Sequence, residues 1–511
     1  MKLFGLRGGV HPEALKHHTE QRAIQRMPMP KHLYIPLQQH IGAPAKAEVE
    51  VGDRVDKGQL LARSQGLISA PIHAPSSGTI IAIDDHPAPH PTGLPVRTIV
   101  IETDHQERIF KNLTEAGDPF QLDAQQIAAR VGQAGIVGMG GATFPSAVKL
   151  MPNPKNPIHT LIINGSECEP YLSCDDRLMQ ERPDDLIDGI RLISHALQAK
   201  RAVLAIEDNK PAAYAAMHAA AQRASGVEIL QIPSRYPMGW EKQLVEIITG
   251  HELPHGQLPG AIGVCVHNVG TAFAIYRTLR IDEPLISRVV TVSGGAVKTP
   301  QNVLVPIGTL VADLLDFCGG LTEEPARLVM GGPMMGQVMP HQQVPIVKGS
   351  SGILALTQHE IDDGPERPCI RCGRCVSACP VGLMPLQLGA RMRVDDVTGA
   401  EQLGVQDCIG CGCCSYVCPS KIPLVQYFNY AKGELQDRRT TKVKTDKTRQ
   451  WAQARTLRLQ QEAEQRAALK AQRQAAKDAK AAKSTSDNLI PVQQQPQQPQ
   501  PQPQPQSEDT L

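Results

Sequence analysis

The sequence lacks long hydrophobic runs, and this absence excludes whole classes of protein. Its longest apolar candidate, residues 261–276, falls short of the roughly 20 residues that a membrane-spanning helix needs, and it contains His267 and Asn268. Glycine, proline and charged residues interrupt the N-terminal segment, so it contains no apolar core of a signal peptide. We therefore expect a cytoplasmic chain, in which structural disulfides are disfavoured.

Aromatic residues and net charge are also scarce. Only 3% of the residues are aromatic, which argues against stacking on single-stranded nucleic acid, and we expect no nucleic-acid partner. The formal net charge is +1, yet residues 438–483 hold 14 basic and 4 acidic side chains, so an acidic body carries a basic tail. We interpret this tail as a solvated helix, with docking on anionic lipid, worth about 1 kcal/mol per cation, as the alternative.

Cysteine, in contrast, is abundant and clustered. Nine of the 13 cysteines lie between Cys369 and Cys418, in two runs that each fit the spacing C-x2-C-x2-C-x3-C-P. Bacterial ferredoxins with two [4Fe–4S] clusters have this spacing, and there the fourth cysteine of each run binds the other cluster. The predicted ligand sets are Cys369, Cys372, Cys375 and Cys418 for the first cluster, and Cys379, Cys408, Cys411 and Cys414 for the second.

Two alternatives stay open for these runs. Zinc also binds four thiolates in paired C-x2-C knuckles, although it requires neither the third cysteine of each run nor the proline that follows. Cys413 does not fit the register of the second run. We interpret it as a bystander, with an exchange of ligands as the alternative.

The N-terminal part of the chain is predicted to form an arm followed by a small β-domain. Residues 1–32 are polar and are expected to cross the surface as an arm. Residues 33–105 contain short strands separated by Gly and Pro, and they resemble the two halves of a lipoyl-type barrel-sandwich hybrid. Carrier domains of that type have a modifiable lysine between the halves, whereas residues 63–70 contain none. The prediction is an unmodified structural module.

The rest of the chain divides by composition and periodicity. Residues 125–285 alternate strand-like and helical segments, which favours an α/β domain with a largely parallel sheet. Residues 286–345 are similar to a soluble-ligand-binding β-grasp module. Residues 360–430 hold the cysteine runs in partly helical sequence, 431–483 form a basic Ala/Gln/Lys-rich helix, and the Pro/Gln-rich 484–511 is predicted to be disordered. The predicted fold class is multidomain α+β.

A glycine-rich segment in the α/β domain is a candidate phosphate-binding loop. Gly138, Gly140 and Gly141 precede helical sequence that contains Lys149, a combination that offers backbone N–H groups and one cation to a phosphate. A tight turn beneath a helix is the alternative. Residues 164–170 follow an apolar strand, where an open α/β sheet places its polar ligand contacts.

Four motifs of this domain resemble, in the same order, the nucleotide-site motifs of the flavoprotein subunit of respiratory complex I, which binds FMN and NADH there. They span residues 138–149, 164–170, 236–241 and 267–271. The residues that the resemblance implies are, near the phosphates, Gly138, Gly140, Gly141 and Lys149; around the flavin, Asn164, Glu167, Asn268 and Thr271; and lining the pocket, Tyr236, Gly239 and Glu241. The sequence departs from that family at Thr143, Ser166, Trp240 and His267.

The order of all the modules resembles the C subunits of Rnf (Rsx) ion-translocating electron-transport complexes, the RnfC family, over roughly residues 1–430. The resemblance implies a peripheral electron-transfer subunit of a translocating oxidoreductase, on the cytoplasmic side of the inner membrane. Its implied partners are the other membrane subunits and ferredoxin or a similar carrier. Its implied cofactors are two [4Fe–4S] clusters and FMN, with NADH as substrate.

A chemical argument also favours a flavin. NADH releases two electrons together as a hydride, whereas a [4Fe–4S] cluster accepts one, and a flavin mediates between the two. The alternatives are an NADH-oxidising flavoprotein module of a soluble reductase or hydrogenase, and a non-catalytic two-cluster adapter whose nucleotide pocket is vestigial.

Overall fold

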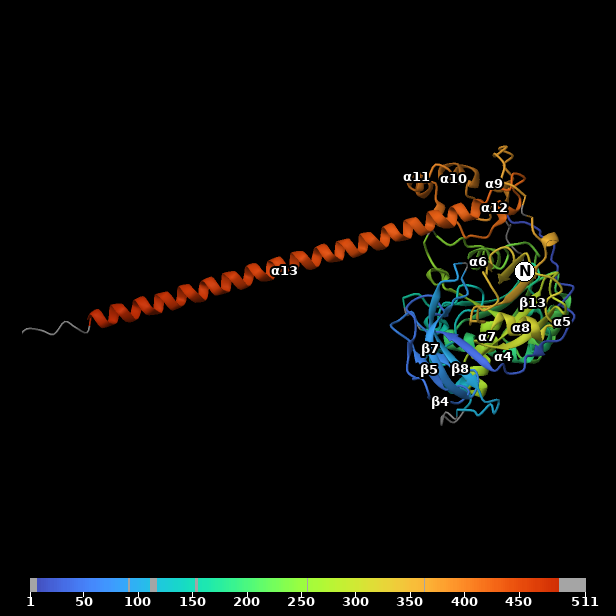
Figure 1. The fold of residues 1–511 in the computed structure, drawn as a ribbon, viewed down its shortest axis with the longest axis horizontal. Helices are drawn as coiled ribbons and strands as arrows, with labels where there is room; N and C mark the ends of the chain where they lie inside the picture. Colours follow the sequence, from blue (N-terminus) through green and yellow to red (C-terminus); the bar gives the residue numbers. More distant parts are fainter. Residues whose placement is uncertain are drawn as a thin grey trace, which may run out of the picture. The chain divides into compact units, whose positions relative to one another are not determined.

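The structure is a computed structural model, and it describes residues 7–90, 92–110, 117–151, 155–254, 256–362 and 364–486. The chain divides into a unit that ends at Lys432 and a second unit that begins at Gly433, and each is described by itself. Figure 1 shows the helices and strands along the chain. Sheets and helices of several kinds follow one another, which confirms the multidomain α+β class.

Two small antiparallel sheets form the barrel-sandwich module, whose strands are blue in Figure 1. One has the order β2 (His32–Pro36), β8 (Pro95–Thr103), β7 (Gly78–Pro87), β4 (Arg54–Val55). The other has the order β3 (Lys46–Ala47), β5 (Leu60–Arg63), β6 (Ile72–His73). Because strand side chains alternate between faces, every second residue enters the shared core. Fully buried examples are Leu33, Ile35, Ile80, Ile99 and Ile101.

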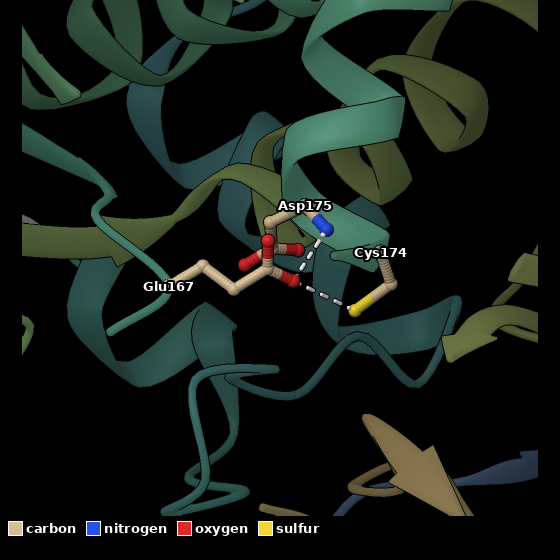
Figure 2. Close-up of side chains that lie close together, drawn as sticks. All are labelled: Glu167, Cys174 and Asp175. Atoms are coloured by element: carbon tan, nitrogen blue, oxygen red, sulfur yellow. Dashed lines mark hydrogen bonds between the residues drawn. The ribbon is translucent and has the colours of Figure 1, made fainter. Parts of the chain in front are cut away.

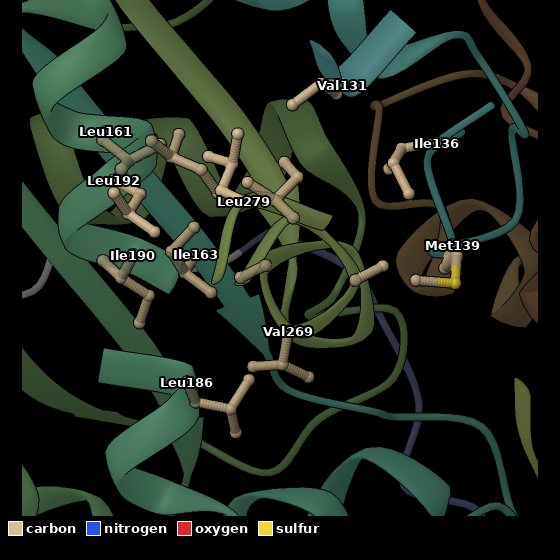
Figure 3. Close-up of a cluster of buried hydrophobic side chains, with 14 of the residues drawn as sticks. Val131, Ile136, Met139, Leu161, Ile163, Leu186, Ile190, Leu192, Val269 and Leu279 are labelled. Carbon is tan, nitrogen blue, oxygen red and sulfur yellow. The ribbon is translucent and has the colours of Figure 1, made fainter. Parts of the chain in front are cut away.

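A four-stranded parallel sheet is the centre of the α/β module. Its order is β11 (Glu228–Ile232), β10 (Arg201–Glu207), β9 (Thr160–Gly165), β12 (Val264–Asn268). Strands β9, β10 and β12 are mostly apolar because both of their faces are covered, whereas the edge strand β11 carries Glu228 and Gln231 and is partly exposed. On one face, Leu161 and Ile163 share a core with side chains of α1 (Ala124–Gln133), α4 (Pro183–Leu197), α5 (Pro211–Arg223) and α7 (Val269–Ile281), as Figure 3 shows in part. On the other face, Ile162 shares a core with α6 (Glu241–Thr249).

A mixed six-stranded sheet and one helix, α8 (Val311–Phe317), form the β-grasp module. The strand order is β1 (Gln25–Arg26), β14 (Gln301–Pro306), β13 (Ser287–Ser293), β17 (Gly352–Leu356), β15 (Arg327–Met330), β16 (Gln337–Val338). Leu314 and Leu315 of α8 pack into one core with Val290 and Val303 of the sheet. The edge strand β1 comes from the N-terminal arm and pairs in parallel with β14.

Most described residues of the N-terminal arm are exposed or half-buried, but four, Val10, Lys16, Thr19 and Met27, are buried. Lys16 is only 7% exposed and Thr19 is fully buried. The hydroxyl of Thr19 lies 2.6 Å from that of Ser173, within hydrogen-bond distance. Burial of the polar side chains of Lys16 and Thr19 is tolerated because each finds a hydrogen-bond partner, which replaces the water that it loses.

Short helices surround a small apolar core in the cysteine module. They are α9 (Arg374–Ala378), α10 (Pro385–Met392), α11 (Val397–Gln402) and α12 (Cys413–Tyr416). The helix α13 (Leu424–Ser486) starts in this module, and every residue from 436 to 483 is exposed. The predicted disorder of 484–511 falls, from residue 487 on, outside the described residues. None of the described helices is both long and apolar enough to span a membrane.

Candidate functional site

The two cysteine runs have the same local geometry. In each run a glycine with positive φ, Gly373 at 75° and Gly412 at 76°, turns the chain directly before a short helix. Two residues after the first cysteine of each run, a backbone N–H donates to its sulfur at 3.4 Å, from Arg371 to Cys369 and from Gly410 to Cys408. Each run therefore turns the chain in the same way after its first cysteine.

The fourth cysteine of each run lies beside the other run. Burial raises the pKa of Cys375, and the charges of Cys418 and Cys372 raise it further. The corresponding group in the second run surrounds Cys414. Burial, followed by the charges of Cys408, Cys411 and Cys379, raises the pKa of Cys414 to about 12. The electrostatic neighbours thus fall into the same two sets, each completed by a cysteine from the opposite run.

The spacing of the sulfurs distinguishes zinc from an iron–sulfur cluster. A zinc ion with four Zn–S bonds of about 2.3 Å holds its sulfurs about 3.8 Å apart. Among the described residues, which include every cysteine, no three cysteine sulfurs lie within 4.8 Å of one another. All 13 thiols are free of disulfides. The described sulfurs therefore do not have the spacing of a tetrahedral zinc site.

The two cysteine sets differ in exposure. Cys369 and Cys372 of the first set are exposed, whereas Cys411 and Cys414 of the second are buried. Cys413 is completely buried. Its thiol is hydrogen-bonded to the sulfur of Cys411, and this bond lowers the pKa of Cys411. Cys413 is thus a direct neighbour of one predicted ligand, a contact that the spacing alone did not reveal.

The predicted nucleotide residues meet at one edge of the parallel sheet. β10 and β11 lie on one side of β9 and β12 on the other, so the strand order reverses between β9 and β12. Ligands bind outside the carboxyl ends of strands at such a switch point. Asn164 and Asn268 stand there, paired across the two strands.

The glycine loop packs on the start of α7. The N–H of Met139 donates to the hydroxyl of Thr271 at 3.0 Å. A Cβ placed on Gly140 would lie 3.4 Å from the side chain of Asn268. Gly141 has φ of 109°, and a Cβ there would meet nothing within 4 Å. The loop is held at its base, at Gly138 and Met139, and is open around Gly141.

Lys149 and Glu241 form an ion pair in the structure. The ammonium of Lys149 lies 3.0 Å from a Glu241 oxygen and donates to the carbonyl of Val266 at 3.0 Å. Both side chains are about one-third exposed, so the pair remains accessible to a ligand. A phosphate near Lys149 would compete with Glu241 for the same cation.

Asn164 and Gly239 join two of the motifs. The Asn164 amide donates to the carbonyl of Gly239 at 2.7 Å, and its Oδ1 accepts from the N–H of Ser166 at 3.1 Å. A Cβ on Gly239 would come within 2.7 Å of the Ser166 hydroxyl. The close approach of the two loops therefore requires glycine at 239.

Glu167 caps the helix α3 (Cys174–Glu181), as Figure 2 shows. Its carboxylate accepts from the N–H of Asp175 at 2.8 Å and from the thiol of Cys174 at 3.2 Å. A carboxylate is favoured at a helix N-terminus because free N–H groups and the helix dipole both attract it. Burial, together with the charge of Glu167, raises the pKa of Asp175 to about 7, and Asn268 donates to Asp175 at 2.6 Å. Glu167 and Asn268 are thus tied together through α3.

Tyr236 connects this pocket to the cysteine module. Its hydroxyl donates to the carbonyl of Cys411 at 2.8 Å, and the residue is 2% exposed. Tyr236 also shares an apolar cluster with Cys413 and Cys168. The resemblance in sequence implied a place for Tyr236 only in the pocket. Its contact with a predicted cluster ligand was not foreseen, because nothing in the local sequence encodes it.

Glu169 connects the loop 164–170 to the β-grasp module. Its carboxylate accepts from the N–H groups of Met334 and Met335 at 3.0 and 2.9 Å. Burial raises the pKa of Glu169 to about 7. Glu169 was not among the predicted residues, although its place in the motif 164–170 was a signal for it.

The pocket contains groups that a flavin would satisfy. His267 is 4% exposed and its Nε2 has no hydrogen-bond partner among the described residues. A buried polar atom without a partner is costly, so a ligand that bonds to it is favoured. This atom and the open backbone around Gly141 are therefore polar groups available to a ligand such as FMN.

Comparisons with known proteins agree module by module. Residues 131–277 match the Nuo51 FMN-binding domain, and residues 368–422 match the 4Fe-4S dicluster domain. Residues 4–106 match the RnfC barrel sandwich hybrid domain, and residues 289–338 match the SLBB domain. The domain matches support FMN and two [4Fe–4S] clusters as the cofactors.

Full-length relatives give the same result. The chain is 50% identical over 444 residues to the C subunit of the ion-translocating oxidoreductase complex of Rhodobacter capsulatus, covering 86% of this chain and 85% of that protein. It is 43% identical to the C subunit of the proton-translocating ferredoxin:NAD(+) oxidoreductase complex of Clostridium ljungdahlii, covering 84% and 94%. The chain therefore belongs to the family of the C subunits of ion-translocating oxidoreductase complexes.

Proposed function

We propose that this chain is the peripheral electron-transfer subunit of a membrane complex that couples NADH and ferredoxin-type redox chemistry to ion translocation. The observation that carries the proposal is the contact between the nucleotide pocket and the cysteine module. The hydrogen bond from Tyr236 to the carbonyl of Cys411 joins a pocket residue directly to a predicted cluster ligand.

Different residues would bind the flavin and the two clusters. When bound, FMN would supply the exchange between hydride and single electrons, and two [4Fe–4S] clusters would supply one-electron storage. Asn164, Asn268 and the glycine loop would hold the flavin, and the eight cysteines would hold the clusters. Cys411 of the second set is buried and bonded to the pocket residue Tyr236, while Cys369 of the first set is exposed and would be accessible to a partner.

The family relationship supports the wider assignment. Relatives are named as subunits of ion-translocating complexes. We infer that the chain binds membrane-embedded subunits of such a complex at the cytoplasmic side of the inner membrane, and that it exchanges electrons with ferredoxin or a similar carrier. No residue is assigned to ion movement.

Anaerobic purification of the full chain with flavin and iron analysis tests the redox assignment. The expected result is bound FMN, two sets of [4Fe–4S] signals in electron paramagnetic resonance (EPR), and reduction of those signals by NADH. A full iron complement without flavin, and without reduction by NADH, would instead identify the non-catalytic adapter.

Fractionation of native cells tests the membrane assignment. The expected result is that the chain sediments with membranes and is released with its partner subunits by detergent. A chain found wholly in the soluble fraction, yet reducible by NADH, would identify the soluble flavoprotein module.

A further inference from the structure

Two buried lysines outside the predicted site hold the loop 164–170. Lys16, from the N-terminal arm, donates its ammonium to the carbonyl of Glu167 at 2.5 Å. Lys210, directly before α5, donates to the carbonyl of Ser166 at 2.6 Å. Their exposed fractions are only 7% and 4%. Two lysine ammonium groups therefore donate hydrogen bonds to consecutive backbone carbonyls of one loop.

These two hydrogen bonds set the direction of the N–H groups of the loop. A trans peptide is planar, with its N–H opposite its carbonyl. The N–H groups of Glu167 and Cys168 therefore point away from the lysines that hold the carbonyls of Ser166 and Glu167. Neither N–H donates to another part of the described chain. Glu167 has φ of 48°, the left-handed conformation that helps successive N–H groups converge on an anion.

The ammonium of Lys16 has carboxylates nearby but, among the described residues, none in direct contact: the charges of Glu167 and Glu207 oppose the effect of burial on its pKa. Lys210 forms an ion pair with Glu207. Within the described ranges, by contrast, no carboxylate oxygen lies within ion-pair distance of Lys16. Burial, with the nearby charge of Lys210, lowers the pKa of Lys16. A buried cation without a carboxylate in direct contact is only partly compensated, so an anion bound nearby is favoured.

We propose that Lys16 and Lys210 are positioning residues for the flavin pocket: they turn the N–H groups of Glu167 and Cys168 toward the ligand, and the ammonium of Lys16, which has no carboxylate of the described residues in direct contact, favours the anionic, reduced flavin. This inference rests on the proposed function, because it requires a flavin in the pocket. It makes the N-terminal arm part of the redox site.

The test compares Lys16→Met with two matched variants in the full chain. Lys31→Met removes an amine from the same arm, where the side chain is 71% exposed. Lys16→Arg keeps the charge. FMN affinity is measured by fluorescence titration, the flavin midpoint potential by spectroelectrochemistry, and cluster integrity by EPR.

We expect Lys16→Met to weaken FMN binding at least about tenfold and to make the midpoint potential more negative. A tenfold loss of preference for the reduced form corresponds to about 30 mV for a two-electron couple. Lys31→Met should leave both quantities unchanged, and Lys16→Arg should restore at least part of each. Both cluster signals should persist in all three variants.

The outcomes separate this inference from the function on which it rests. Wild-type chain that binds no flavin would overturn both. Wild-type chain that binds flavin, with unchanged affinity and potential in Lys16→Met, would overturn only the role of the lysines. Loss of flavin together with both clusters would also overturn it, because Lys16 would then serve folding rather than the pocket.

Discussion

The hydrogen bond between Tyr236 and Cys411 makes a quantitative prediction. Tyr236→Phe keeps the ring but removes the hydroxyl that donates to the Cys411 carbonyl at 2.8 Å. That carbonyl accepts no other hydrogen bond from the described residues, and Cys411 is 7% exposed. Leaving a buried carbonyl unsatisfied costs about 1–3 kcal/mol. At about 1.4 kcal/mol per factor of ten, local opening of the second cysteine run should become about 5- to 150-fold more frequent.

Amide hydrogen exchange under anaerobic conditions measures this opening. Peptides that cover residues 408–418 should exchange faster by that factor in Tyr236→Phe, while peptides of the parallel sheet should not change. Tyr416→Phe is the matched control, because Tyr416 lies in the same module but is 53% exposed. Equal exchange in Tyr236→Phe and wild type would refute the idea that this bond holds the cysteine module to the pocket.

Three further predictions concern ligands, charge and core. Cys418→Ser should abolish the EPR signal of the first cluster and keep that of the second, whereas Cys379→Ser should do the reverse. If Cys418→Ser instead abolished the second signal, or Cys379→Ser the first, the fourth cysteine of each run would not bind the cluster of the other run. Burial lowers the pKa of Lys348 to about 7 from 10.5, so between these pH values only the unfolded chain binds the proton; wild type should therefore gain thermal stability as pH rises, by up to about 1.4 kcal/mol per pH unit, relative to Lys348→Met. Parallel pH profiles would argue against this. Ile163→Ala should cost about 2–5 kcal/mol in denaturant unfolding because Ile163 is fully buried, while Ile281→Ala, 56% exposed, should cost little.

Local patterns predicted the elements of this fold well. The strand-like residues around Ile163 and the helical segment around Ile190 carry the periodicity of a buried strand and an amphipathic helix, and both form. The FMN domain and the two clusters could also be inferred, because cysteine spacing and glycine loops are short-range signals.

Long-range contacts could not be predicted in the same way. The polar arm gave no sign that Lys16 would be buried against Glu167, which is 151 residues away along the chain. The hydroxyl of Tyr236 reaches Cys411 across 175 residues. Such contacts depend on how modules pack, and neither hydrophobic periodicity nor motif spacing encodes that packing.

The arm also explains how a pocket and a cysteine module from distant parts of the chain stay together. Val10 and Tyr236 exchange backbone hydrogen bonds at 2.8 and 2.9 Å, and Gly9 donates to the carbonyl of Ala378 at 2.9 Å. A Cβ on Gly8 would lie 2.3 Å from the carbonyl of Cys379, so only glycine fits there. Cys379 and Cys411 belong to the same predicted ligand set, and the arm and Tyr236 contact both. The rate of electron transfer between pocket and clusters depends on their separation, and the contacts of this short segment, which carries no redox group of its own, help to fix that separation.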